Sequence, residues 1–142
     1  MGVAGLIVLI CVGVTGAVTV GAWMTMGDVQ RATTKRGRHR RLPAELVLGH
    51  MVFGIAAVTA WVCFVVIGRQ YAAWVAVALM VIAAVLGITM FVRWIPSYRP
   101  RATQLASADG AGPEQNLPIG LVLAHGAFAV IGVGIALATV LV

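Results

Sequence analysis

Four long apolar runs constrain this chain more than any other feature. They cover residues 3–24, 44–67, 72–92 and 118–142, and each is 21–25 residues long. A helix rises 1.5 Å per residue, so each run is long enough to cross a hydrocarbon core of about 30 Å. Only 10% of the residues are charged, which is too few to cover a water-facing surface. We therefore expect an all-α integral membrane protein, with residues 1–142 forming one domain of four transmembrane helices.

The linkers between these runs carry most of the positive charge. The first, 25–43, and the third, 93–117, are long, whereas the second, 68–71, is a tight hairpin. The first linker holds six of the ten basic residues: Arg31, Lys35, Arg36, Arg38, Arg40 and Arg41. Basic loops stay on the cytoplasmic side of a membrane. We therefore expect linkers 25–43 and 93–117 in the cytoplasm, both termini on the outer side, and a bacterial-type plasma membrane as the location.

Aromatic residues near the ends of the runs fit this orientation. Tyr71 and Trp74 would lie at the outer boundary, and Trp23, Trp94 and Tyr98 at the cytoplasmic boundary. Such belts form because amphipathic rings favour the headgroup level. The basic residues then face anionic lipid headgroups rather than nucleic acid. The arginines expected to contact those headgroups are Arg36, Arg38, Arg40, Arg41, Arg99 and Arg101.

The remaining reactive residues form no catalytic pattern. Cys11 and Cys63 lie within apolar runs without a second cysteine at metal-ligand spacing, so we expect buried, inert thiols. Glu45 falls in a first helical turn, where the helix dipole favours a carboxylate. Paired carboxylates, a phosphate-binding glycine loop, a Ser-His-Asp set and a zinc motif are all missing from the sequence. We do not expect an enzyme that works on its own.

The chain contains an internal repeat. Residues 42–53 (LPAELVLGHMVF) and 117–128 (LPIGLVLAHGAF) are identical at seven of twelve positions, with a constant offset of 75. The preceding runs match more weakly, because Gly16 and Gly87 each stand seven residues before a tryptophan. These matches predict a tandem repeat of two helical hairpins. The second and fourth helices would run parallel and be related by a pseudo-two-fold axis along the membrane normal.

The repeat places two histidines at the same depth. His50 and His125 each lie seven residues beyond a proline that begins a helix, which is about 10 Å along the helix axis. An imidazole inside a membrane is costly without a partner and is a functional candidate by default. If both rings face the pseudo-axis, they confront each other across one interior. That arrangement suits two axial ligands of a b-type haem, so His50 and His125 are the predicted cofactor-binding and metal-ligating residues.

Other roles for the pair stay open. Each histidine could bond to a helix carbonyl, to a serine or threonine, or to the other histidine, and simply lock the second and fourth helices together. A quinone hydrogen bond or a proton relay is a further alternative. His39 lies in the basic linker and is expected to be solvated. Small residues follow both histidines and would suit either a flat macrocycle or close helix packing: Gly54 and Ala57 after His50, and Ala129, Gly132 and Ala136 after His125.

In its general plan the chain resembles small four-helix membrane cytochromes and the haem-bearing anchor subunits of respiratory complexes. The resemblance lies in the four spans and the placement of His50 and His125. It implies electron transfer between a haem and a quinone or a partner subunit. We therefore expect a small membrane subunit of a larger redox complex. The alternatives are a cofactor-free accessory or assembly subunit of a membrane complex, and a small transporter that is complete only as an oligomer.

Overall fold

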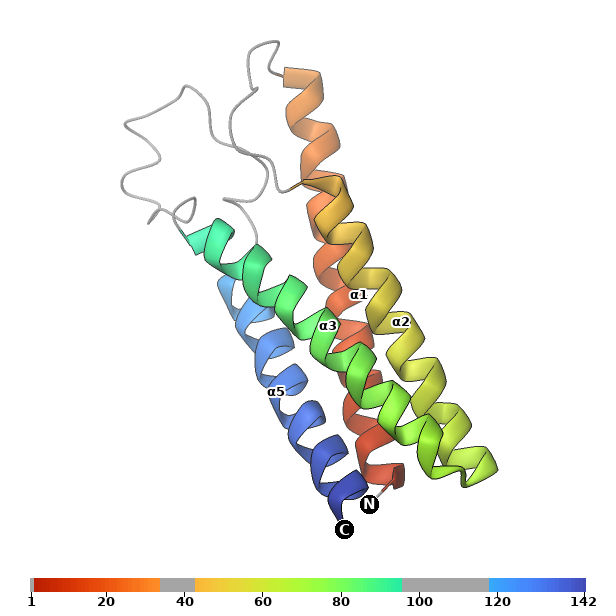
Figure 1. Ribbon diagram of the computed structural model, residues 1–142. Coiled ribbons are helices and arrows are strands. Elements are labelled where there is room, and N and C mark those ends of the chain that lie inside the picture. Colours follow the sequence, from red (N-terminus) through yellow and green to blue (C-terminus); the bar gives the residue numbers. More distant parts are fainter. Residues whose placement is uncertain (1, 34–42, 96–117) are drawn as a thin grey trace.

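The computed structural model describes residues 2–33, 43–95 and 118–142, and these residues are almost entirely helical (Figure 1). The four helices are α1 (Gly2–Thr33), α2 (Ala44–Ile67), α3 (Gln70–Trp94) and α5 (Ile119–Leu141). Each contains a segment long and apolar enough to cross a bilayer. The described part of the chain is thus all-helical, with four candidate spans of a multi-pass membrane protein.

Local sequence explains where the helices begin and end. Pro43 and Pro118 precede α2 and α5, and the carbonyl of each accepts hydrogen bonds from backbone N–H groups three and four residues later. Gly68 ends α2 with φ of 72°, a left-handed conformation that glycine adopts without a steric penalty. Its N–H donates to the Phe64 carbonyl at 2.8 Å, and α3 begins two residues later. Helix α1 continues to Thr33, well beyond the apolar run that ends at Met24.

The helices form a bundle in which each has two close neighbours. The most extensive packing joins α2 to α3 and α1 to α5, and smaller contacts join α1 to α2 and α3 to α5. Consequently α2 and α5 face each other across the bundle, as do α1 and α3. The N- and C-termini lie at one end of the bundle together with the α2–α3 turn, and we call this the terminal end (Figure 1). The opposite end holds the end of α1 and the start of α2, and we call it the loop end.

Buried side chains are concentrated near the terminal end. The main cluster consists of Leu9, Ala57, Trp61, Ala73, Ala76, Val77, Met80, Ala136 and Val140. Two hydrogen bonds tie helix ends together there: the Trp61 indole N–H donates to the Gly2 carbonyl at 3.0 Å, and the Gln70 amide donates to the Val140 carbonyl at 3.3 Å. The outer surface is apolar, with side chains such as Val66 and Val130 mostly exposed. Such a surface suits lipid rather than water.

Two side chains do not lie where the sequence led us to expect them. Trp94 is only 4% exposed, so its ring does not lie on the lipid-facing surface as a belt residue would. Trp23 is half-buried, with its indole nitrogen buried. Tyr71 and Trp74 are exposed, as expected. Tyr98 lies outside the described residues. Cys63 is exposed, so the expectation that both thiols are buried was wrong for this residue. Apolar side chains satisfy lipid and interior equally well, so hydropathy alone could not separate these positions.

Candidate functional site

The half-buried rings of His50 and His125 meet between helices α2 and α5. His50 comes from α2 and His125 from α5, the two helices on opposite sides of the bundle. Their ring centroids are 5.9 Å apart and the ring planes are inclined at 76°. Each ring is about two helical turns inside the apolar segment that its proline begins. The structure therefore brings together the two side chains that the sequence singled out.

Each histidine uses the same ring nitrogen to contact a neighbouring helix. His50 Nδ1 lies 2.8 Å from the Ala83 carbonyl on α3, and His125 Nδ1 lies 3.1 Å from the Val12 carbonyl on α1. A carbonyl oxygen only accepts hydrogen bonds, so the proton must be on Nδ1 in both rings. In a neutral imidazole the other nitrogen, Nε2, then carries a free lone pair. Both rings are thus fixed in the tautomer whose Nε2 can accept a proton or bind a metal.

A glycine lies against each ring. A Cβ added at Gly16 would be 3.0 Å from Cε1 of His125, and one added at Gly87 would be 3.0 Å from Cε1 of His50. These distances are tighter than ordinary side-chain contacts, so the rings approach the helix backbone closely because no side chain intervenes. The absence of a Cβ at Gly16 and Gly87 therefore fixes how near α1 and α3 come to the imidazoles.

The two histidines have matching surroundings. The carbonyl partners Val12 and Ala83 are 71 positions apart in the chain, and so are Gly16 and Gly87. Thr15 breaks the match, because its hydroxyl oxygen lies 3.2 Å from His125 Nδ1 and also bonds to the Cys11 carbonyl. The residue 71 positions further on is Leu86, which has no hydroxyl. His125 therefore has one more polar neighbour than His50.

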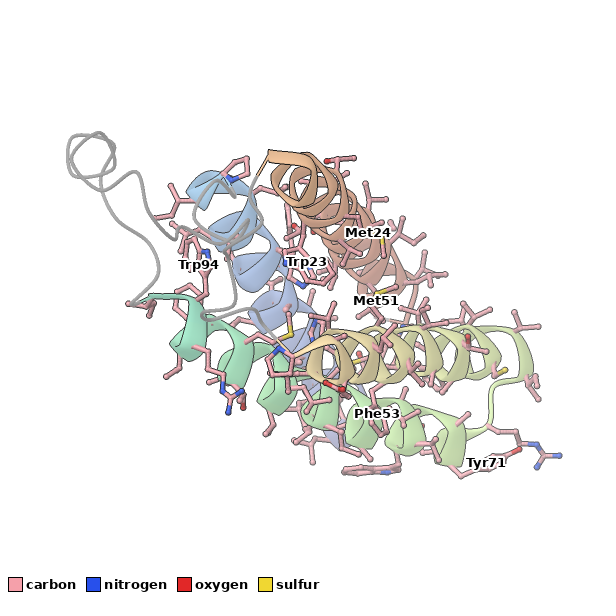
Figure 2. The ribbon with its side chains drawn as sticks, turned by 90° about the horizontal axis from the view of Figure 1, so that it is seen from above. Trp23, Met24, Met51, Phe53, Tyr71 and Trp94 are labelled. Atoms are coloured by element: carbon pink, nitrogen blue, oxygen red, sulfur yellow. The ribbon has the colours of Figure 1, made fainter. Side chains whose placement is uncertain are left out.

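The structure adds Trp23 to the neighbourhood of the histidines. Val12, Gly16, Thr19 and Trp23 follow one another at four, three and four residues along α1, which places them on one helix face. This face contacts His125 through Val12 and Gly16. Trp23 lies two turns nearer the loop end, and Figure 2 shows it directed from α1 toward the middle of the bundle. In the sequence, Trp23 and Trp94 each stand seven residues after a glycine, and this shared spacing singled out Trp23. The spacing does not indicate which way the indole rings point.

The indole nitrogen of Trp23 is buried and has no hydrogen-bond partner. It is the one such buried side-chain N or O atom found among the described residues. A buried N–H without an acceptor is destabilising, and native structures keep few of them. The donor therefore points to a polar acceptor that the described residues do not supply.

Among the described residues, the two imidazoles are not part of a larger cluster of metal-ligating side chains. No group of three or more His, Cys, Asp or Glu side chains that could hold a metal ion occurs in the described parts of the chain. A zinc site needs three or four protein ligands. The sequence-predicted lipid contacts Arg36, Arg38, Arg40, Arg41, Arg99 and Arg101 lie outside the described residues, as does His39.

Comparison with known proteins gave no match. No protein-family model, no curated protein and no solved structure is significantly similar to the chain.

Proposed function

We propose that the protein is a small membrane subunit of a redox complex and that it holds one b-type haem between His50 and His125. The observation that carries the proposal is the meeting of the two rings at 5.9 Å, each with Nδ1 directed at a backbone carbonyl. A hydrogen bond from the second ring nitrogen to a carbonyl is the usual support of a metal-binding histidine. With two such ligands, a haem iron is suited to transfer single electrons.

The number of ligands favours haem over a bare metal ion. A porphyrin supplies four nitrogens of its own, so the iron needs two further ligands, and the site offers two imidazoles. Two imidazoles bound on opposite sides of one metal ion have ring centres about 6.3 Å apart, given metal–nitrogen bonds of about 2.0 Å. The observed 5.9 Å is close to that spacing.

The proposal includes a duplicated architecture and an orientation. Two tandem hairpins, α1–α2 and α3–α5, account for the matched partners of the histidines and for the parallel directions of α2 and α5. The basic linkers 25–43 and 93–117 would then lie in the cytoplasm and both termini on the outer side. In a bacterial-type plasma membrane, this orientation puts the histidine pair in the cytoplasmic half of the bilayer.

Absorption spectroscopy of the protein purified in mild detergent tests the proposal. We expect a Soret band and, after reduction, an α band. His50→Ala and His125→Ala should each abolish the low-spin spectrum, because either change removes one axial ligand. His39→Ala is the matched control, since His39 lies in the basic linker, and it should keep the full spectrum. Helix content and elution volume of every variant should be measured to exclude misfolding. A wild-type protein that binds no haem even when titrated with haemin would refute the proposal.

A cofactor-free accessory subunit is the second candidate, and the same hydrogen bonds favour it. The bond from His50 to Ala83 joins α2 to α3, and the bond from His125 to Val12 joins α5 to α1, so the histidines already stabilise the bundle without a ligand. A colourless protein that co-purifies with other membrane subunits would support this candidate. A colourless homo-oligomer stabilised by a substrate would instead support a small transporter.

A further inference from the structure

We propose that the Trp23 indole N–H binds a carboxylate of the haem and thereby orients the haem with its acidic edge toward the loop end of the bundle. This inference rests on the proposed function and deepens it. Its starting point is the buried Trp23 nitrogen, for which residues 2–33, 43–95 and 118–142 supply no acceptor. An acceptor brought by a ligand would remove the cost of burying this donor.

The position of Trp23 relative to the histidines suits this role. Trp23 is seven residues beyond Gly16, whose Cα carries no side chain between α1 and the His125 ring. Seven residues correspond to two turns on the same face and about 10 Å along the axis. A haem carries its two carboxylates at one edge of the macrocycle, away from the iron. A donor two turns from the axial ligand is therefore placed for that edge, not for the iron.

The packing of the bundle favours the loop end over the terminal end. Toward the terminal end, the face that follows His50 is closed by Trp61, which is fully buried and already bonded to the Gly2 carbonyl. The corresponding face after His125 is closed by the buried residues Gly132 and Ala136. Trp61 has its acceptor, whereas Trp23 has none. Toward the loop end, the buried indole nitrogen of Trp23 is thus the donor that has no partner among the described residues.

Haem titration of the full-length apoprotein in detergent tests the inference, with haemin and its dimethyl ester as the two probes. For haemin, Trp23→Phe should weaken binding about tenfold, because a hydrogen bond to a charged group is lost. The Soret band should keep its low-spin shape, since both axial ligands remain. For the dimethyl ester, which lacks the carboxylate charge, wild type and Trp23→Phe should differ by about twofold or less. Trp74→Phe is the matched control, since Trp74 is exposed and lies nine residues before Ala83, the partner of His50, and it should bind both probes like wild type.

The outcomes separate the two proposals. Equal affinity of wild type and Trp23→Phe for haemin would overturn the role of Trp23 and leave the haem site standing. An equal loss with both probes would also overturn it, because the loss would then be independent of the carboxylates. A wild type that binds neither probe would refute the haem site and this inference with it. If Trp23→Phe does not fold, Trp23→Tyr is the second variant, because tyrosine keeps an aromatic side chain with a hydrogen-bond donor. Like wild type, Trp23→Tyr should bind haemin more tightly than the dimethyl ester. Equal affinity of Trp23→Tyr for both probes would overturn the inference.

Discussion

The two ends of the bundle differ in how their interiors are filled. The terminal end contains the main cluster of buried side chains, including fully buried Trp61, and its polar groups are paired through Trp61 with Gly2 and Gln70 with Val140. Toward the loop end the described helices bury few side chains, and the Trp23 nitrogen lacks a partner. The histidine pair lies between these two regions. Among the described residues, the terminal end thus has the properties of a packed core, whereas the loop end buries fewer side chains and leaves one indole N–H unpaired.

The two halves of the repeat show the same contrast. Around the histidines they agree except at Thr15, since Val12 and Gly16 correspond to Ala83 and Gly87. At the terminal end they differ, because Gly5 and Trp61 on one side stand where Ala76 and Ala136 stand on the other. In the first half the large Trp61 side chain packs against Gly5. In the second half two small residues, Ala76 and Ala136, occupy the corresponding positions.

The largest effect on stability is expected at Trp61. Trp61→Ala removes a fully buried indole and its bond to the Gly2 carbonyl, and should lower the free energy of unfolding by about 3 kcal/mol. Haem bound per folded protein should stay near the wild-type value, because the histidines keep their partners. Far-UV circular dichroism during titration with dodecyl sulfate measures the stability. Trp74→Ala, on the exposed surface, should change it by under about 1 kcal/mol. An equal loss of unfolding free energy in Trp61→Ala and Trp74→Ala would contradict the conclusion that the terminal end is a packed core.

Gly5→Ala should have the next largest effect. Its Cβ would lie 2.8 Å from Cζ2 of Trp61, so the rigid indole or α1 must move, at a cost of about 1–3 kcal/mol. In a Trp61→Ala background the same change should cost almost nothing, and this non-additivity is the test. Gly13→Ala is the control, because a Cβ there meets no atom within 4 Å. Additive losses would show that Gly5 does not act through Trp61.

Gly16→Ala and Gly87→Ala test whether the two histidine surroundings are equivalent. Each Cβ would meet ring atom Cε1 at 3.0 Å, so each ring must shift by a few tenths of an ångström. We expect equal losses of about 1 kcal/mol in unfolding free energy and similar changes in the haem spectrum. Gly54→Ala, where a Cβ meets no atom within 4 Å, is the matched control. Clearly unequal losses would contradict the equivalence of the two halves.

Thr15→Val should have the smallest effect. It removes the hydroxyl near His125 Nδ1, but the ring keeps the Val12 carbonyl as acceptor. Interhelical hydrogen bonds in membranes contribute on average about 0.6 kcal/mol, so a loss of about that size is expected. Thr59→Val is the control, because Thr59 is exposed and bonds to its own helix at Ile55. A loss above about 2 kcal/mol would mean that Thr15, rather than Val12, holds the ring.

Both the spans and the histidine pair follow from the sequence alone. Uninterrupted apolar runs need no tertiary information, because a bilayer accepts only segments that satisfy their own backbone hydrogen bonds. The equal depth of His50 and His125 follows from their shared distance to Pro43 and Pro118. The repeat predicted that the rings would face each other, and they lie 5.9 Å apart.

Only the tertiary structure decided which helices are neighbours and which way their side chains point. Nothing in the sequence showed that His50 contacts α3 and His125 contacts α1, or that Trp23 faces inward while Cys63 faces outward. The physical reason is that lipid is as apolar as the protein interior, so no hydrophobic stripe marks the buried face of a membrane helix. Close approach at glycines and a few hydrogen bonds select the packing instead, and these depend on residues far apart in the chain.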